Sequence, residues 1–322
     1  MKILITGGAW FIGSSLAQKL LTREWIEEIV IIDNLSTGNK NNIPKDEKIK
    51  FIEWDAGDTE LIKDYDFDEI YHLASAASPK KYQIYAIETM IVNAEATRKL
   101  LDYCVRQLKE KKRKVKFLFA STSEIYWEPI SHPQSETDLS RININWPRAC
   151  YDVSKAYGDV LTRLYAEEKK IDTKIVRIFN TYWPALDKKD GRIICNFIEQ
   201  AKKKEPFTIY GAWNQTRSFS YVDDTVDGIL TVMEKGKSGE VYNVGNPFQE
   251  FTVESVARII CKIFRNEYSV IRRDLPQDDP SKRKPSINKI QSLDWNPKVN
   301  IYTGIKKMIG EELLSEIESF TK

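Results

Sequence analysis

Tyr151 and Lys155 are the two residues of this chain whose types and spacing most clearly predict chemistry. Residues four apart lie on one face of a helix, so both side chains are expected to reach a common site. Free tyrosine has a pKa of about 10 and is a poor base at neutral pH. A neighbouring ammonium group lowers the pKa of a phenol, so the pair predicts a general base that takes a proton from a hydroxyl group.

A polar segment precedes this pair by about thirty residues, as Ser121-Thr122-Ser123-Glu124. It follows the apolar run 115–120, so we expect its side chains at the end of a strand. Thr122 can hydrogen-bond the same substrate hydroxyl as Tyr151. A tyrosine and a lysine at this spacing are common on helix surfaces, so the prediction depends on the rest of the chain.

The N-terminal segment supports the prediction that Tyr151 and Lys155 form a catalytic pair. An apolar strand runs into a glycine-rich turn at Gly7 and Gly13, and a helical pattern follows over residues 14–21. A turn in this context binds the pyrophosphate of a dinucleotide. Asp33 ends a second apolar run, where a carboxylate bonds ribose hydroxyls and favours NAD over NADP. The middle glycine of the fingerprint is replaced by Trp10, whose indole would fill the space of the pyrophosphate.

The elements that position these residues alternate between strand and helix patterns. Strands are expected at 2–6, 29–33, 49–53, 69–73, 116–121 and 175–177, and helices at 88–106 and 153–169. Such alternation predicts an α/β fold with a Rossmann-type doubly wound parallel sheet, whose ligands bind at the carboxyl ends of the strands. We expect residues 1–178 to bind the dinucleotide and residues 179–322 to form a smaller substrate-binding region with helices at 194–203, 222–233 and 253–264. Part of it, about 214–235, is expected to return to the first domain.

Composition excludes several classes of function. The net charge of +2 gives no electrostatic case for nucleic acid, and no apolar run approaches the ~18 residues of a membrane span. The four cysteines are far apart and fit reduced thiols in a cytoplasmic protein, while two histidines cannot build a metal site. The first strand begins at residue 2, so no signal peptide is expected.

Several longer motifs carry a resemblance to a known family. They are His72-Leu73-Ala74-Ser75-Ala76-Ala77-Ser78-Pro79, Ser121-Thr122-Ser123-Glu124-Ile125-Tyr126, Pro147-Arg148-Ala149-Cys150-Tyr151-Asp152, Arg177-Ile178-Phe179-Asn180-Thr181-Tyr182, Asp190-Gly191-Arg192, Gln215-Thr216-Arg217-Ser218-Phe219 and Asp278-Asp279-Pro280-Ser281-Lys282-Arg283-Lys284-Pro285. With them the chain resembles, over essentially its whole length, the extended short-chain dehydrogenases/reductases (NAD-dependent epimerases/dehydratases) that act on nucleotide sugars. The Thr-Ser-Glu triplet is similar to the triplet found in the family members that decarboxylate UDP-glucuronate to UDP-xylose. Val153-Ser154 departs from the Glu-Gly usual there.

The resemblance implies a reaction that recycles NAD through a 4-keto sugar. Tyr151 would take the proton of the sugar 4-hydroxyl, Lys155 would tune it, Thr122 would orient the hydroxyl, and Glu124 would position the sugar or serve a proton step. Arg283 would face the glucuronate carboxylate. The implied cofactor residues are Gly7, Trp10, Phe11, Ile12, Gly13, Asp33, Asn34, Asp55, Ala56, Leu73, Ala74, Asn93, Tyr151 and Lys155. The implied UDP-sugar residues are Pro79, Asn180, Arg192, Asn196, Tyr210, Arg217 and Arg283, and a homodimer is expected.

Two alternatives remain open at this point. The first is a 4-epimerase or 4,6-dehydratase on a UDP- or dTDP-sugar, which would need no partner for a carboxylate. The second is a catalytically inactive Rossmann-fold binding protein, which follows if Trp10 is the natural residue and blocks the cofactor. The intact Tyr151 and Lys155 argue against the second.

Seven of the eight tryptophans stand where the family usually has glycine or where a turn favours it: Trp10, Trp25, Trp54, Trp127, Trp146, Trp183 and Trp213. Trp25 is expected at the glycine-rich position just after a helix, and Trp295 stands where the family itself has tryptophan. The chain holds 14 glycines in 322 residues, against a usual share of ~7%. We hypothesise that a codon its host reads as glycine, UGA in some bacterial lineages, was translated as tryptophan.

Overall fold

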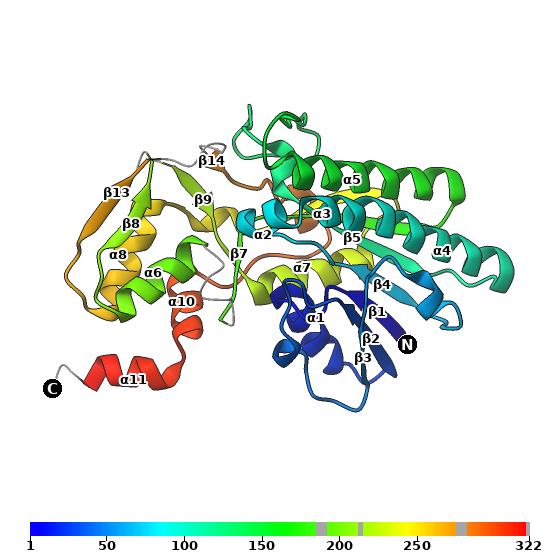
Figure 1. Cartoon of the computed structure of the whole chain (residues 1–322), viewed down its shortest axis with the longest axis horizontal. Helices are drawn as coiled ribbons and strands as arrows, with labels where there is room; N and C mark the ends of the chain where they lie inside the picture. Colours follow the sequence, from blue (N-terminus) through cyan, green and yellow to red (C-terminus); the bar gives the residue numbers. More distant parts are fainter. Residues whose placement is uncertain (185–191, 212–214, 275–281, 320–322) are drawn as a thin grey trace.

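The computed structural model describes residues 1–184, 192–211, 215–274 and 282–319. Its central sheet has seven parallel strands in the order β11-β6-β5-β4-β1-β2-β3 (Figure 1). Their bounds are β1 (Lys2–Thr6), β2 (Glu28–Asp33), β3 (Ile49–Glu53), β4 (Glu69–His72), β5 (Lys116–Thr122), β6 (Asp172–Ile178) and β11 (Glu240–Val244). The predicted α/β doubly wound sheet is thus confirmed. The strand order reverses between β1 and β4, so the ligand crevice of such a sheet lies at their carboxyl ends.

Helices cover both faces of this sheet. α1 (Phe11–Leu21) and α7 (Val222–Lys235) lie on one face, and α4 (Thr97–Lys111) and α5 (Ala149–Lys169) lie on the other (Figure 1). Along β1, Ile3 and Ile5 pack into the core that includes α1 and α7, whereas Leu4 packs into the core that includes Leu100 of α4. Both faces of the strand are therefore buried, which explains why β1 reads as a continuous apolar run.

The segment between β4 and α4 is helical but interrupted. It consists of α2 (Pro79–Ile84), α3 (Ala86–Ile91) and a π-helical turn, Val92–Ala96, that leads into α4. The sequence predicted one helix over 88–106, and the π turn is the difference. This turn buries Asn93, whose side-chain nitrogen donates to Ser154 Oγ on α5 at 3.0 Å. π turns of this kind occur frequently at functional sites.

The later part of the chain forms a smaller lobe beside the sheet (Figure 1). Its strands are β7 (Thr181–Tyr182) with β10 (Ser220–Tyr221), β8 (Phe207–Tyr210) with β13 (Val270–Arg273), and β9 (Thr216–Ser218) between β12 (Glu250–Thr252) and β14 (Lys282–Arg283). Its helices are α6 (Ile193–Lys202), α8 (Val253–Phe264), α10 (Ile301–Ile309) and α11 (Glu311–Ser319), whereas α9 (Asn288–Gln291) packs on β11 of the central sheet. Short 3-10 helices are η1 (Lys40–Asn42), η2 (Thr59–Ile62), η4 (Ser123–Tyr126) and η5 (Pro247–Gln249). A domain boundary at residue 178 stays a prediction, and α7 and β11, which come after it, belong to the layers of the central sheet. Within the described ranges, no helix has both the length and the apolar composition that a membrane crossing requires.

Candidate active site

Helix α5 holds Tyr151 and Lys155 against the carboxyl end of β5. Gly158 permits the close approach, because a Cβ there would lie 2.3 Å from Cζ of Phe119 on β5. Both side chains are buried, with 6% and 3% of their surface exposed. Lys155 Nζ donates to the carbonyl oxygen of Ala120 at 2.7 Å and lies 5.9 Å from the centre of the Tyr151 ring. The structure brings together the pair that the spacing predicted.

Burial controls the protonation of this pair. It raises the pKa of Tyr151 above its ordinary value, and a hydrogen bond with Thr122 offsets part of that rise. Burial also lowers the pKa of Lys155 to about 7, against the opposing charge of Asp159. The protein groups alone therefore leave Tyr151 a neutral phenol, and burial outweighs the lowering expected from Lys155. The amine of Lys155 lies between its charged and neutral forms near neutral pH.

An ionised carboxylate lies close to the tyrosine. Glu124, in η4 directly after β5, accepts hydrogen bonds from both Nη atoms of Arg283, one of them at 3.0 Å. Arg148 Nη2 lies 2.7 Å from the same carboxylate. Burial raises the pKa of Glu124, but the charges of Arg283 and Arg148 outweigh it and hold the pKa at about 2. Arg148 belongs to the resemblance motif, yet its pairing with Glu124 was not foreseen. Its position three residues before Tyr151 was the available signal.

A second tyrosine, Tyr82 of α2, packs face to face against Tyr151. The ring centres are 4.9 Å apart and the planes differ by 12°. Tyr82 is 1% exposed, and its hydroxyl finds no hydrogen-bond partner among the described residues. Burial raises the pKa of Tyr82. Most buried hydroxyl groups have a hydrogen-bond partner, so this unpaired hydroxyl beside Tyr151 is an exception within the site. The sequence singled out Pro79 but not Tyr82, which lies three residues further on.

The glycine turn has the close backbone contacts of a dinucleotide cradle. Gly7 has a φ of +76°, and a Cβ there would lie 2.6 Å from the nitrogen of Ala74 after β4. A Cβ on Gly13 would lie 2.3 Å from the carbonyl oxygen of Gly7. Asp33 at the end of β2 accepts hydrogen bonds from the nitrogens of Ala9 at 3.0 Å and Leu35 at 2.9 Å. Burial raises the pKa of Asp33. This part of the site fits the ribose and backbone contacts of NAD.

The other residues predicted for the cofactor lie along the same edge of the sheet. Asp55 and Ala56 follow β3, and the Asp55 side chain accepts from the nitrogen of Gly57 at 2.8 Å. Asn34 is exposed and follows Asp33, and Asn93 is buried against α5. Phe11 and Ile12 begin α1, and Leu73 and Ala74 follow β4.

Position 10 does not fit this cradle. Trp10 precedes the first residue of α1, between the two glycines, and its ring is half-buried. The guanidinium carbon of Arg192 lies 5.0 Å from the centre of that ring and 5.1 Å from that of Phe11. Arg192 also donates to the carbonyl oxygen of Ala77 at 3.3 Å. The Trp10–Arg192 stack therefore spans from the start of α1 to the segment after β4, across the crevice where a pyrophosphate binds.

The residues predicted for the substrate lie mainly in the smaller lobe. Asn196 of α6 and Tyr210 of β8 line one cavity of about 200 Å³, and Tyr210 is 45% exposed. Arg217 of β9 is buried and donates to the carbonyl oxygen of Thr216 at 2.9 Å. The carbonyl oxygen of Asn180 accepts from Ser220 at 2.9 Å. Pro79 is exposed as the first residue of α2. Asp190, Gly191 and residues 278–281 of the resemblance motifs lie outside the described residues.

The tryptophans at predicted glycine positions differ in their backbones. Trp127, directly after η4, has φ 47° and ψ −119°, and it is the only described tryptophan with a positive φ. Its ring lies edge-on to Trp146, with centres 5.3 Å apart. The prediction for Trp25 is wrong: α1 ends at Leu21 with Thr22 as its cap, so Trp25 lies beyond the position that follows the cap. Trp213 lies outside the described residues.

We also searched for side chains that could ligate a metal ion. Across the part of the chain that the structure describes, no group of three or more histidine, cysteine, aspartate or glutamate side chains could hold a metal ion.

This fold and this site define a class of protein. The sequence profile of the NAD dependent epimerase/dehydratase family matches residues 3–245, about three quarters of the chain, and the chain belongs to this family. It is an enzyme of this kind, and its cofactor is NAD.

Individual members of the family with similar sequences or structures are as follows. The chain is 36% identical to UDP-glucuronic acid decarboxylase 1 of Arabidopsis thaliana, over 97% of this chain and 69% of that protein. It is 38% identical to UDP-glucuronic acid decarboxylase 1 of Xenopus tropicalis, over 96% and 71%. Among solved structures, it resembles UDP-glucose 4-epimerase from Thermotoga maritima with UDP-glucose, with a TM-score of 0.85, 26% identity and coverage of 100% and 99%. The NAD complex of UDP-glucose 4-epimerase from Thermus thermophilus gives a TM-score of 0.83, 26% identity and coverage of 98% and 99%.

Proposed function

We propose that this chain decarboxylates UDP-glucuronate to UDP-xylose through a 4-keto intermediate. The observation that carries the proposal is the cluster of Glu124, Arg283 and Arg148 beside Tyr151. Two guanidinium groups suit a substrate that bears a carboxylate, because the guanidinium fork matches carboxylate geometry. A neutral hexose needs no such partner. The decarboxylase names of relatives at 36% and 38% identity support the same substrate.

Tyr151 and Thr122 begin the reaction at the sugar 4-hydroxyl. Thr122 orients this hydroxyl, and Tyr151 takes its proton. NAD, which the cradle of Gly7, Gly13 and Asp33 would hold, would supply reversible hydride transfer at C4. Because burial raises the pKa of Tyr151, the phenol needs a positive charge beside it to act as a base. Arg192 lowers the pKa of Tyr151, and Lys155, whose Nζ lies 5.9 Å from the Tyr151 ring centre and whose pKa is about 7, would add to this charge when protonated.

The keto group at C4 makes loss of the carboxylate feasible. The C5–C6 bond breaks and carbon dioxide leaves. The electron pair of the broken bond stays on C5 and forms an enolate with the C4 carbonyl. The enolate then takes up a proton from solvent at C5, and Tyr151 returns its own proton to the C4 oxygen when the carbonyl is reduced again. Glu124 is ionised at neutral pH, so it acts first as an acceptor that positions its partners rather than as an acid.

Arg283 has to exchange partners in this scheme. It is bound to Glu124 in the described structure, and a substrate carboxylate would compete for the same guanidinium. Arg148 then keeps Glu124 paired while Arg283 turns to the substrate. On the nucleotide side, Tyr210 and Asn196 are suited to contact the base, and Arg217 to contact a phosphate.

A 4-epimerase acting on a neutral UDP-sugar is the second candidate. The solved UDP-glucose 4-epimerases with TM-scores of 0.85 and 0.83 favour it. Incubation with UDP-glucuronate and with UDP-glucose, followed by chromatography of the nucleotide sugars, separates the two. UDP-xylose from the first substrate supports the decarboxylase. Interconversion of UDP-glucose and UDP-galactose, with UDP-glucuronate unchanged, would overturn it.

A homodimer completes the proposal. Helices α3 and α5 pack together and expose Ile87 (71%), Met90 (44%), Tyr157 (48%) and Val160 (50%). Four large side chains at this exposure form an apolar face that a second copy could bury. Replacing Ile87 by lysine should halve the mass measured by light scattering. Ile130→Lys, in an exposed loop away from these helices, serves as the control. An unchanged dimer mass for Ile87→Lys would contradict this interface.

A further inference from the structure

Trp127 adopts a backbone conformation that suits glycine and strains any residue with a Cβ. Its φ of 47° and ψ of −119° correspond to the first central residue of a type II′ turn, where glycine dominates. The hydrogen bond from the Trp127 nitrogen to the carbonyl oxygen of Glu124 at 2.9 Å closes the last turn of η4, so Trp127 is the residue at which the chain leaves that short helix. This strained position therefore lies three residues after Glu124 of the active site.

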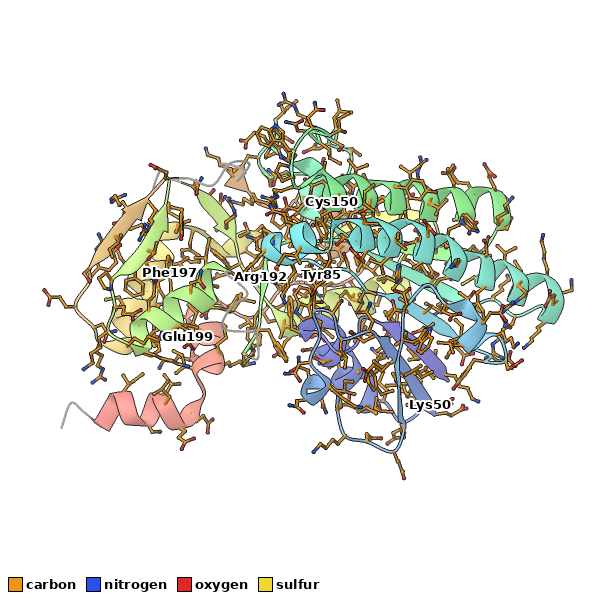
Figure 2. All side chains as sticks on the ribbon, in the orientation of Figure 1. Lys50, Tyr85, Cys150, Arg192, Phe197 and Glu199 are labelled. Atoms are coloured by element: carbon orange, nitrogen blue, oxygen red, sulfur yellow. The ribbon has the colours of Figure 1, made fainter. Side chains whose placement is uncertain are left out.

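Trp10 gives a second and independent observation. Its indole, stacked on Arg192, lies in the part of the crevice where the glycines on either side make their close contacts. Figure 2 shows Arg192 between Phe197 and Glu199 of the smaller lobe and Tyr85. The stack thus occupies the junction of the lobe with the cofactor crevice. A residue without a side chain at position 10 would leave the turn open to the pyrophosphate.

The described tryptophans also differ by location. Trp10 and Trp54 follow β1 and β3, and Trp127 follows η4 after β5, so these three lie at the ligand edge of the central sheet. Trp183 follows β7 of a separate two-stranded sheet, and its ring centre lies 6.1 Å from that of Phe11 at the start of α1. Trp295 is the contrast, because it is 4% exposed in the core and lies 3.2 Å from a Cβ position on Gly228. Drift does not explain indoles at that edge combined with 14 glycines in 322 residues.

We infer that the functional protein carries glycine at positions 10 and 127 because its host reads their codon as glycine. The same codon reading extends the inference to the other five suspect positions, although the structure gives position 25 no glycine-type backbone. The chain with tryptophan at position 10 holds its own cofactor crevice closed through the Trp10–Arg192 stack. This inference rests on NAD as the cofactor and not on the identity of the sugar. It goes beyond the choice between decarboxylase and epimerase.

The codons of the gene give the first test. The inference predicts UGA at all seven suspect positions and UGG at Trp295. A UGG codon at position 10 or 127 would overturn it, because that codon specifies tryptophan. This readout requires no activity, so it fails or holds separately from the proposed reaction.

Single variants of the chain give the second test. Trp127→Gly should raise the midpoint of thermal unfolding by about 2–5 °C, although glycine normally destabilises. Trp295→Gly, the matched control, should lower it strongly because it opens a cavity in the core. Trp10→Gly should bind NAD about tenfold more tightly or better in a calorimetric titration. A lower midpoint for Trp127→Gly, or unchanged NAD affinity for Trp10→Gly, would refute the corresponding half of the inference.

Discussion

Replacing the buried Lys155 by methionine should abolish turnover and yet stabilise the fold at and below neutral pH. Burial lowers the pKa of Lys155 from 10.5 to about 7. In the unfolded chain the amine keeps its ordinary pKa. Between these two values the unfolded state binds one more proton than the folded state, so stability rises with pH across this window. Below a pH of about 7 both states bind the proton, and the full cost of burying the charge remains.

The size of the effect follows from the same pKa difference. At about 1.4 kcal/mol for each pKa unit, burying the charged amine costs at most about 5 kcal/mol below pH 7. The variant also loses the hydrogen bond from Lys155 to Ala120 and the attraction to Asp159. These losses reduce the net gain to about 1–3 kcal/mol.

Thermal unfolding of the parent and Lys155→Met at about pH 6, 8 and 10 measures this gain. Lys169→Met is the matched control, since Lys169 is exposed at the end of the same helix. The advantage of Lys155→Met should be largest at the lowest pH and should vanish at the highest, while Lys169→Met shows no such trend. A difference that does not vary with pH would refute the reasoning, because Lys155 would then have an ordinary pKa.

Three further predictions, made for the chain with glycine at the seven suspect positions, address the chemistry and the charged cluster. Tyr151→Phe should lower turnover by about 10²–10⁴-fold, as measured by steady-state rates; retained turnover would exclude Tyr151 as the base. Arg283→Ala should reduce decarboxylation by about 10²-fold or more, whereas the exposed neighbour Lys282→Ala should not, as followed by carbon dioxide release; equal rates would contradict the carboxylate role. The lowered pKa of Glu124, about 2 against 4.5, gives stability that is fully present above pH 4.5 and is lost as the pH falls toward 2. The stability of the parent relative to Glu124→Gln should therefore decrease as the pH falls from 4.5 toward 2, as measured by unfolding at several pH values. A stability difference that stays constant over this range would show that Glu124 has an ordinary pKa.

Local patterns were sufficient to predict the sheet and the catalytic pair. β1 and β2 are buried on both faces and stand out as short apolar runs between helices, whereas the edge strand β3 is only partly buried. Tyr151 and Lys155 share a helix, and their approach follows from helical spacing alone. The glycine turn was recognisable because Gly7 and Gly13 each make a backbone contact that a Cβ would prevent.

Contacts between distant segments could not be predicted in this way. Arg283 reaches Glu124 across 159 residues, and nothing near either residue in the sequence encodes that pairing. The stacking of Tyr82 on Tyr151 likewise depends on how α2 lies against α5. The prediction that Trp25 directly follows the cap of α1 was wrong, because α1 ends at Leu21 and its cap is Thr22. Side-chain charges also mislead when burial is unknown, as the raised pKa of Tyr151 illustrates.

One measurement tests the central claim most directly. The chain with glycine at the seven suspect positions is incubated with NAD and UDP-glucuronate, and carbon dioxide release and the nucleotide-sugar products are followed. The account predicts release of carbon dioxide with UDP-xylose as the product. Bound NAD without any release would contradict the decarboxylase and would favour an epimerase or dehydratase that acts on a neutral nucleotide sugar.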